Sequence, residues 1–176
     1  MDEMEDIMQY FNVSACDING NGKLIITDPC YKDKHNGSIE LIDVAAGIWT
    51  GCIDARHGYV TCLYAWNVAS SFLIANDTFY EDCDQTIYVD SGQAGIFNFG
   101  SYPFGSIGEF EDKNSFYGKI CEMTTDHMWG FVDEGIVSNS GYGDGEYIVR
   151  VIVDDGKIVA VKIMFAESYE KVDEDE

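Results

Sequence analysis

Six cysteines and three histidines set the nucleophilic chemistry that this chain of 176 residues could perform. Cys30 follows an Asp-Pro pair, and His35 lies a few residues further along. Because a neighbouring imidazolium lowers the pKa of a thiol, Cys30 is a candidate catalytic nucleophile. Free cysteines are usually buried, however, so we favour the simpler interpretation of Cys30 as a buried thiol at a strand end.

A second candidate site lies in the segment VDSGQAGIF, residues 89–97. Ser91 and Gly92 interrupt an apolar strand pattern, which predicts a bend or bulge. Asp90 and Ser91 are candidate catalytic residues at this bend, but the G-x-S-x-G elbow that usually presents a nucleophilic serine is absent. We therefore favour a structural turn, and we keep Asp90, Ser91 and Gln93 as ligand-binding candidates.

Residues 17–28, DINGNGKLIITD, have the oxygen spacing of a calcium-binding loop. The candidate metal ligands are Asp17, Asn19, Asn21 and Asp28. Pro29 follows directly, so the exiting helix of an EF-hand cannot form. Calcium is the only cofactor that the sequence suggests, and a hairpin turn built on the Asn-Gly pairs is the simpler interpretation.

A third polar segment, SNSGYGDGEY at residues 138–147, superficially resembles a glycine-rich phosphate loop. It lacks the Lys-Ser/Thr pair of a P-loop and precedes a strand pattern, so we predict a wide hairpin turn. Tyr142 and Asp144 are ligand-binding candidates in this turn. The complete set of ligand-binding candidates is Asp28, Tyr31, Asp90, Ser91, Gln93, Tyr142 and Asp144.

Strand patterns dominate the elements that must position these residues. The predicted strands cover residues 12–18, 23–27, 39–44, 47–56, 59–68, 86–99 with a break at the bend, 146–153 and 157–165. Residues 81–84, EDCD, are expected to form an acidic loop. Helices are predicted over residues 2–10 and over residues 114–124, the second with Asn114 or Ser115 as its N-cap.

These elements predict a mainly β (α+β) fold, with an antiparallel, hairpin-rich sheet or partly closed barrel and one or two short helices. The length favours one globular domain, residues 1–166, followed by an acidic tail, residues 167–176. The chain contains no apolar run of membrane-spanning length, and its first residues do not resemble a signal peptide. We therefore expect a cytoplasmic protein with free thiols.

The formal net charge of −22 limits the classes of partner. Without residues 1–6 and the tail, 22 acidic residues still face nine basic ones. Phosphate backbones and anionic membranes are bound by clustered lysines and arginines, and this chain has only two arginines, Arg56 and Arg150. Direct binding of nucleic acid or of membranes is therefore disfavoured.

The segments ITDPCY, VDSGQAGIF and GYGDGEYIV, with the final DDGKIVAVKIMF, resemble a family of uncharacterised bacterial and phage proteins that is catalogued as a domain of unknown function. The resemblance implies a compact β-rich domain, and it implies no catalytic residues. A phage origin would suggest an acidic inhibitor of a host protein.

We expect a non-enzymatic binding or interaction domain that recognises a protein or a small molecule, in an oligomeric state that the sequence does not give. The alternatives are a hydrolase-like enzyme and an aromatic pocket for a small ligand. The hydrolase site would combine Asp28, Cys30, Asp90, Ser91, Gln93 and Asp144. The pocket would be lined by Trp49, Trp66, Tyr88, Phe97 and Tyr142, although aromatic residues in strands more often belong to the core.

Overall fold

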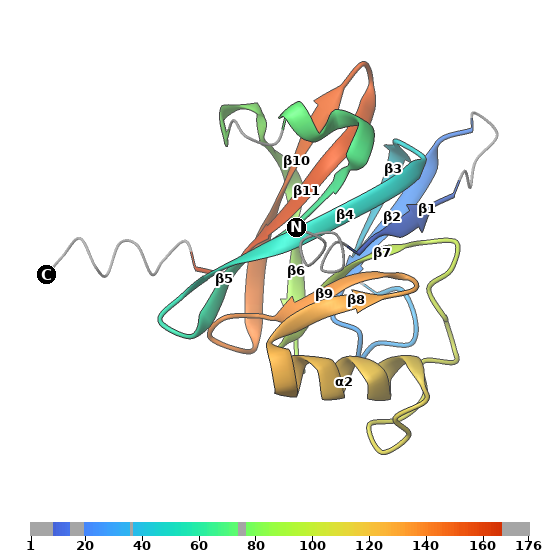
Figure 1. Ribbon diagram of the computed structural model, residues 1–176, viewed down its shortest axis with the longest axis vertical. Helices are drawn as coiled ribbons and strands as arrows, with labels where there is room; N and C mark the ends of the chain where they lie inside the picture. Colours follow the sequence, from blue (N-terminus) through green and yellow to red (C-terminus); the bar gives the residue numbers. More distant parts are fainter. Residues whose placement is uncertain (1–8, 15–19, 36, 74–76, 167–176) are drawn as a thin grey trace, which may run out of the picture.

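The fold is a strongly bent, nearly closed, mostly antiparallel sheet with an α-helix packed against its outside (Figure 1). The computed structural model describes residues 9–14, 20–35, 37–73 and 77–166. The strands are β1 (Phe11–Val13), β2 (Gly22–Thr27), β3 (Ile39–Val44), β4 (Gly47–Arg56), β5 (Tyr59–Asn67), β6 (Glu81–Val89), β7 (Gln93–Asn98), β8 (Trp129–Val132), β9 (Gly135–Asn139), β10 (Gly145–Asp154) and β11 (Lys157–Met164). The helical elements are the 3-10 helices η1 (Val68–Leu73) and η2 (Asp77–Phe79) and the α-helix α2 (Phe116–His127).

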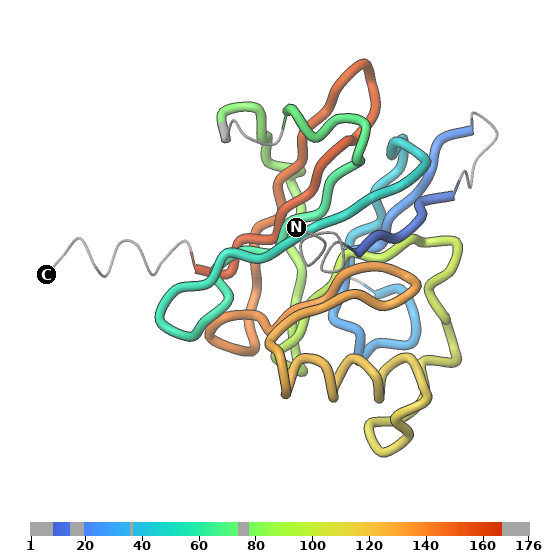
Figure 2. The backbone as a smooth tube through the Cα atoms, viewed as in Figure 1, coloured from blue at the N-terminus to red at the C-terminus, as the bar shows by residue number. Residues whose placement is uncertain are grey.

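Strand β11 joins the two halves of the sheet. Along the sheet the order is β1-β4-β5-β11-β3-β2-β7-β9-β8, and β10 and β6 branch from β11 on its other side. All pairings are antiparallel except that of β11 with β3, which rests on the pair of Ile158 and Val44 and on the hydrogen bond from Ala45 N to Ile158 O. The tube in Figure 2 shows how these long hairpins wrap around a common interior. The prediction of a mainly antiparallel β fold is therefore confirmed.

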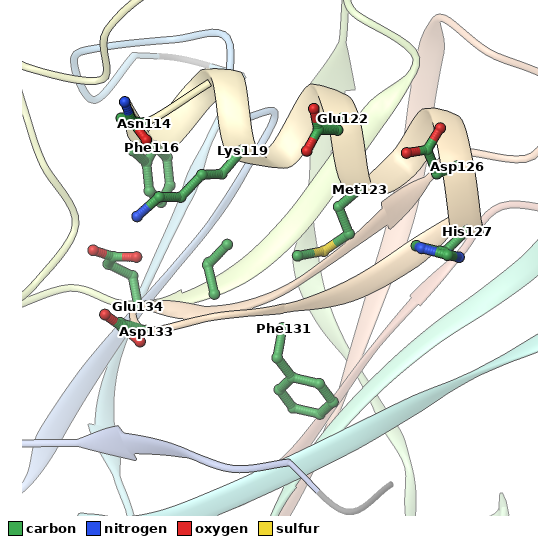
Figure 3. Close-up of a pocket in the computed structure, with 11 residues that line it drawn as sticks. Asn114, Phe116, Lys119, Glu122, Met123, Asp126, His127, Phe131, Asp133 and Glu134 are labelled. Carbon is green, nitrogen blue, oxygen red and sulfur yellow. The ribbon is translucent and has the colours of Figure 1, made fainter. Parts of the chain in front are cut away.

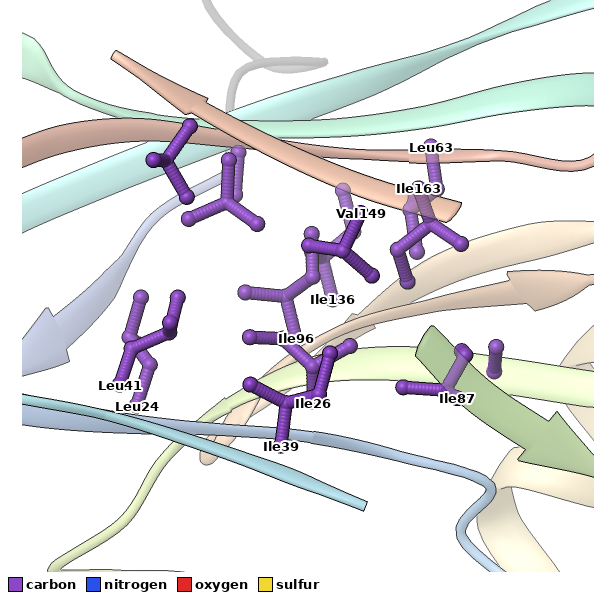
Figure 4. Packing of buried hydrophobic residues seen from close by; sticks show 14 of the residues in the cluster. Leu24, Ile26, Ile39, Leu41, Leu63, Ile87, Ile96, Ile136, Val149 and Ile163 are labelled. Atoms are coloured by element: carbon purple, nitrogen blue, oxygen red, sulfur yellow. The ribbon is translucent and has the colours of Figure 1, made fainter. Parts of the chain in front are cut away.

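Buried side chains form three clusters, because the sheet has an interior and two covered outer faces. The interior cluster includes Leu24, Ile26, Ile39, Ile96 and Ile163, which point toward one another from facing strands (Figure 4). A second cluster lies between β2, β7, β9 and helix α2, and a third lies beside η1 on the outer face of β5, β10 and β11. Strand β7 is buried on both faces along its whole length, and its four central residues, Ala94 to Phe97, contain no polar side chain.

The helix predicted over residues 114–124 is present two residues later, over Phe116–His127. Ser115 is its N-cap, with its hydroxyl accepting a hydrogen bond from Gly118 N at 3.0 Å. Met128 ends the helix in a left-handed conformation. The helix predicted over residues 2–10 lies almost wholly outside the described residues.

Three sequence expectations for the chain were wrong, and one hairpin was missed. The strands before and after the Asn-Gly pairs do not form a hairpin with each other, since β1 pairs with β4 and β2 pairs with β3 and β7. The acidic segment at residues 81–84 is the first part of β6, not a loop. The hairpin of β8 and β9 was not predicted, since β8 has only four residues. The segment at residues 138–147 is not a hairpin turn, because it connects β9 and β10, which pair with other strands.

Gly118 offers a test of how α2 packs. Alanine is the better helix former by about 1 kcal/mol, yet a Cβ at Gly118 would lie 1.9 Å from the carbonyl oxygen of Asp112. We therefore expect Gly118→Ala to lower the free energy of unfolding by about 1–3 kcal/mol, as overpacking does. Thr125→Ala, at an exposed position of the same helix, is the control and should be neutral or slightly stabilising in urea denaturation. A stabilising Gly118→Ala would contradict this packing.

Candidate functional site

The Asp-Pro-Cys-Tyr segment forms a tight turn directly after β2. Tyr31 N donates to Asp28 O at 3.2 Å, and Cys30 N donates to the Asp28 side chain at 2.9 Å. Such a turn is favoured because Asp accepts from the backbone two residues ahead and because Pro presets φ. The turn leaves the Asp28 carboxylate fully buried and aimed at the bend between β6 and β7.

The bend between β6 and β7 receives this carboxylate. The backbone N–H groups of Asp90 and Ser91 both donate to Asp28 Oδ2 at 2.7 Å, and Ser91 Oγ donates to Oδ1 at 2.6 Å. Gly92, at φ 71°, supplies the left-handed residue that reverses the chain. Successive N–H groups at such a bend form a site for an anion, and here the anion is the protein's own carboxylate.

The same network continues into helix α2. Gln93 Oε1 lies 2.9 Å from Ser91 Oγ, and Gln93 Nε2 donates to Thr124 Oγ1 at 2.8 Å. Asn139 Nδ2 also donates to the carbonyl oxygen of Thr124, at 3.2 Å. One buried chain of polar groups thus connects the turn after β2, the bend before β7, strand β9 and the helix.

The third predicted segment joins this site through its backbone. Ser140 N donates to Gly92 O at 2.9 Å, and Gly145 pairs with Val89 at the start of β10. The Tyr142 and Asp144 side chains are exposed, and the Tyr142 ring stacks on Tyr59 at 5.3 Å. The structure therefore brings the backbones of the three segments together, and the Tyr142 and Asp144 side chains are not among the groups that donate to Asp28.

Cys30 lies beside a shallow pocket of about 500 Å³ next to this network. The pocket is lined by Cys30, Tyr31, Lys32, Asp33, His35, Ile107 and Gly108. Burial, followed by the negative charge of Asp28, raises the pKa of the Cys30 thiol to about 12. The thiol is therefore protonated at neutral pH, the opposite of what a nucleophilic cysteine requires.

The contacts that hold His35 involve residues other than Cys30. Its Nδ1 accepts a hydrogen bond from Gly37 N at 2.9 Å, and its ring lies 3.9 Å from that of Tyr31. The Tyr31 hydroxyl donates a hydrogen bond to the exposed Asp90 carboxylate. This hydrogen bond, together with burial, raises the pKa of Tyr31. No interaction between Cys30 and His35 occurs among the described contacts, so the arrangement offers no thiol–imidazole pair.

The calcium-binding loop stays a prediction, since Asp17 and Asn19 lie outside the described residues. Of its other candidate ligands, Asn21 donates to Asp43 at 3.2 Å, and Asp28 is occupied by the four donors described above. Within the described part of the chain, no group of three or more His, Cys, Asp or Glu side chains is arranged to hold a metal ion.

The five aromatic residues proposed for a small-ligand pocket do not line one cavity. Trp49 belongs to the interior cluster, Phe97 to the cluster under α2 and Trp66 to the cluster beside η1. Tyr88 and Tyr142 are half exposed. These residues are therefore core and surface aromatics, as their positions in strands suggested.

Sequence reasoning missed a cleft between helix α2 and the β8–β9 hairpin (Figure 3). It has a volume of about 620 Å³, and its lining includes Lys119, Met123, Asp126, Asp133 and Glu134. The one available signal was the Asp133-Glu134 pair directly after the aromatic segment WGFV. Neither that signal nor the helix pattern could show that the two elements face each other.

Comparisons of the chain with protein-family models, curated proteins and solved structures found no match. The resemblance to uncharacterised bacterial and phage proteins therefore stays a prediction. No helix of the described residues is long and apolar enough to cross a membrane.

Removing the buried carboxylate tests its role in the fold. In Asp28→Asn, the amide cannot accept all four hydrogen bonds and places its own NH₂ near backbone N–H groups. We expect a loss of about 3 kcal/mol in the free energy of unfolding, since unsatisfied buried groups cost about 1–3 kcal/mol each. Asp90→Asn, which changes the exposed carboxylate of the bend that donates to Asp28, should cost less than about 1 kcal/mol in the same urea titration. Equal losses in the two variants would contradict this role.

The raised pKa of Cys30 predicts low thiol reactivity. At pH 8 we expect iodoacetamide to modify Cys30 at least about tenfold more slowly in the folded protein than in urea, because only the thiolate reacts. Peptide mapping by mass spectrometry reports the rate for this cysteine alone. The pKa of this thiol is higher in the folded protein than in the unfolded chain, where it is near 9. The thiol therefore makes its full contribution to the free energy of unfolding below pH 9, and this contribution is lost as the pH rises from 9 to 12. Rapid modification of Cys30 at pH 8 would show that the thiol is activated.

Proposed function

We propose that this protein is a non-enzymatic interaction protein that binds a basic surface of a partner protein. The observation that carries the proposal is that the polar groups of the motif residues form hydrogen bonds with one another inside the fold. All four donors around Asp28 are backbone N–H groups or the Ser91 hydroxyl, and the Cys30 thiol is held protonated. A hydrolase built on these residues would need a free nucleophile and a base that reaches it.

The charge of the protein favours a basic partner. Two lysines are already paired on one acidic residue, since Lys23 and Lys34 lie 3.2 Å and 2.6 Å from Glu40. Lys113 pairs with Glu122 at 2.8 Å, and Lys162 is buried with its ammonium 4.3 Å from the centre of the Tyr80 ring. Four of the ten lysines and arginines thus contact other groups of the same chain, and 32 acidic residues face those ten basic ones, which leaves a surface with excess carboxylates. Such a surface steers association toward a positively charged partner.

A protein that normally binds nucleic acid would offer such a basic groove. An acidic body can occupy that groove without binding nucleic acid itself. The family that the sequence resembles includes bacterial and phage proteins. If this chain comes from a phage, the partner would be a host protein and the consequence of binding would be inhibition. The hydrolase and small-ligand alternatives have no comparable support from the described contacts.

Salt dependence tests this proposal. A partner captured from bacterial lysate on the immobilised protein is purified, and its Kd is measured by isothermal titration calorimetry at 50 and 500 mM NaCl. Because the Debye length shrinks from about 14 Å to about 4 Å over this range, we expect binding to weaken at least about tenfold. An acidic partner, or a Kd that stays within about twofold, would contradict the proposal.

A further inference from the structure

The cleft between α2 and the β8–β9 hairpin combines an apolar floor with acidic walls. Met123 points from the helix toward the hairpin, and Phe116 and Val132 contribute further apolar surface (Figure 3). Gly130 lets Met123 lie against β8, since a Cβ there would be 2.3 Å from the Met123 sulfur. A volume of about 620 Å³ is within the usual range of ligand sites, about 300–1,000 Å³.

The two walls of this cleft carry four carboxylates against one lysine. Glu122 forms an ion pair with Lys113. Lys119 points toward the turn that holds Glu134, and its positive charge opposes the rise in the pKa of Glu134 (Figure 3). Asp126, near the C-terminal end of the helix, and Asp133, in the turn between β8 and β9, are exposed and lie at opposite ends of the cleft (Figure 3). These two carboxylates are therefore the charges that an incoming cation would meet.

Burial and the neighbouring Asp133 raise the pKa of Glu134 despite Lys119. Burial is the larger cause, and Asp133 adds a repulsion between the two carboxylates of this turn. A positive group placed between the walls would relieve this repulsion, whereas a phosphate or carboxylate ligand would increase it.

We propose that this cleft receives a short segment of the partner protein that carries arginine or lysine side chains next to an apolar one. The inference rests on the proposed function and adds the place and the chemistry of recognition. The apolar side chain lies on Met123 and Val132, and the cationic groups reach Asp126 and Asp133. Long basic side chains suit such a cleft, because their aliphatic stems pack on apolar surface while their charged ends stay near the rim.

The test uses a blocked tripeptide, N-acetyl Arg-Leu-Arg amide, titrated into the whole protein labelled with ¹³C at the methionine methyl groups and with ¹⁵N. We expect saturable shifts at the Met123 methyl and at amides of α2, β8 and the turn between β8 and β9. The Met123 methyl signal is assigned by its loss in Met123→Leu. Replacing both arginines by uncharged citrulline should weaken binding at least about tenfold.

A matched pair of double variants locates the charges responsible. Asp126→Asn with Asp133→Asn should weaken the peptide about tenfold, while Asp154→Asn with Asp155→Asn removes two exposed charges from the distant β10–β11 turn and should change binding less than about twofold (Figure 1). Lys119→Gln, which removes the competing cation, should bind the peptide about two to three times more tightly.

Two results would overturn the inference: shifts spread evenly over the acidic surface, or equal losses in the two double variants. Either result leaves the proposed function standing if the partner protein still binds in a salt-dependent manner. Conversely, a salt-independent partner would contradict the proposed function even where the peptide occupies the cleft.

Discussion

A single buried carboxylate determines how this protein holds its distant segments together. Asp28 accepts hydrogen bonds from the turn that follows it and from a bend more than 60 residues later. A buried charge is costly unless donors surround it, and four donors do so here. The bend can in turn keep its two N–H groups buried because the carboxylate satisfies them, so each segment requires the other.

The hydrogen bonds around Asp28 distinguish the segments that resemble a reactive site from the cleft that we propose as the binding site. The polar groups of the Asp-Pro-Cys and Asp-Ser-Gly segments form hydrogen bonds with each other. Gln93 and Thr124 extend this network to helix α2. The helix is thereby fixed across from the β8–β9 hairpin, with which it forms the acidic cleft. If the cleft is the contact surface, as we propose, these motifs hold the helix that forms one of its walls.

Local patterns predicted the fold and the bend, whereas contacts between distant segments could not be predicted. The final hairpin and the break at Ser91-Gly92 were correct because alternation and turn chemistry act over a few residues. The start of β6 reads as a loop in the sequence because its residues are acidic and exposed. It is a strand because it pairs with β10, which is distant in the sequence. From the sequence, Asp28 is a candidate for calcium binding, for ligand binding and for catalysis, and only the fold shows which donors surround it. The cleft was missed because its two walls are separate local elements.

Hydrogen exchange at the backbone amides of Asp90 and Ser91 tests most directly whether Asp28 is a structural anchor. If their donation to the buried carboxylate holds the segments together, these two amides should exchange only through global unfolding, with a protection free energy equal to that of core amides in β7. Local opening, seen as exchange of Asp90 and Ser91 at least about a hundredfold faster than the β7 amides, would contradict the account and leave this bend free to act as a site of its own.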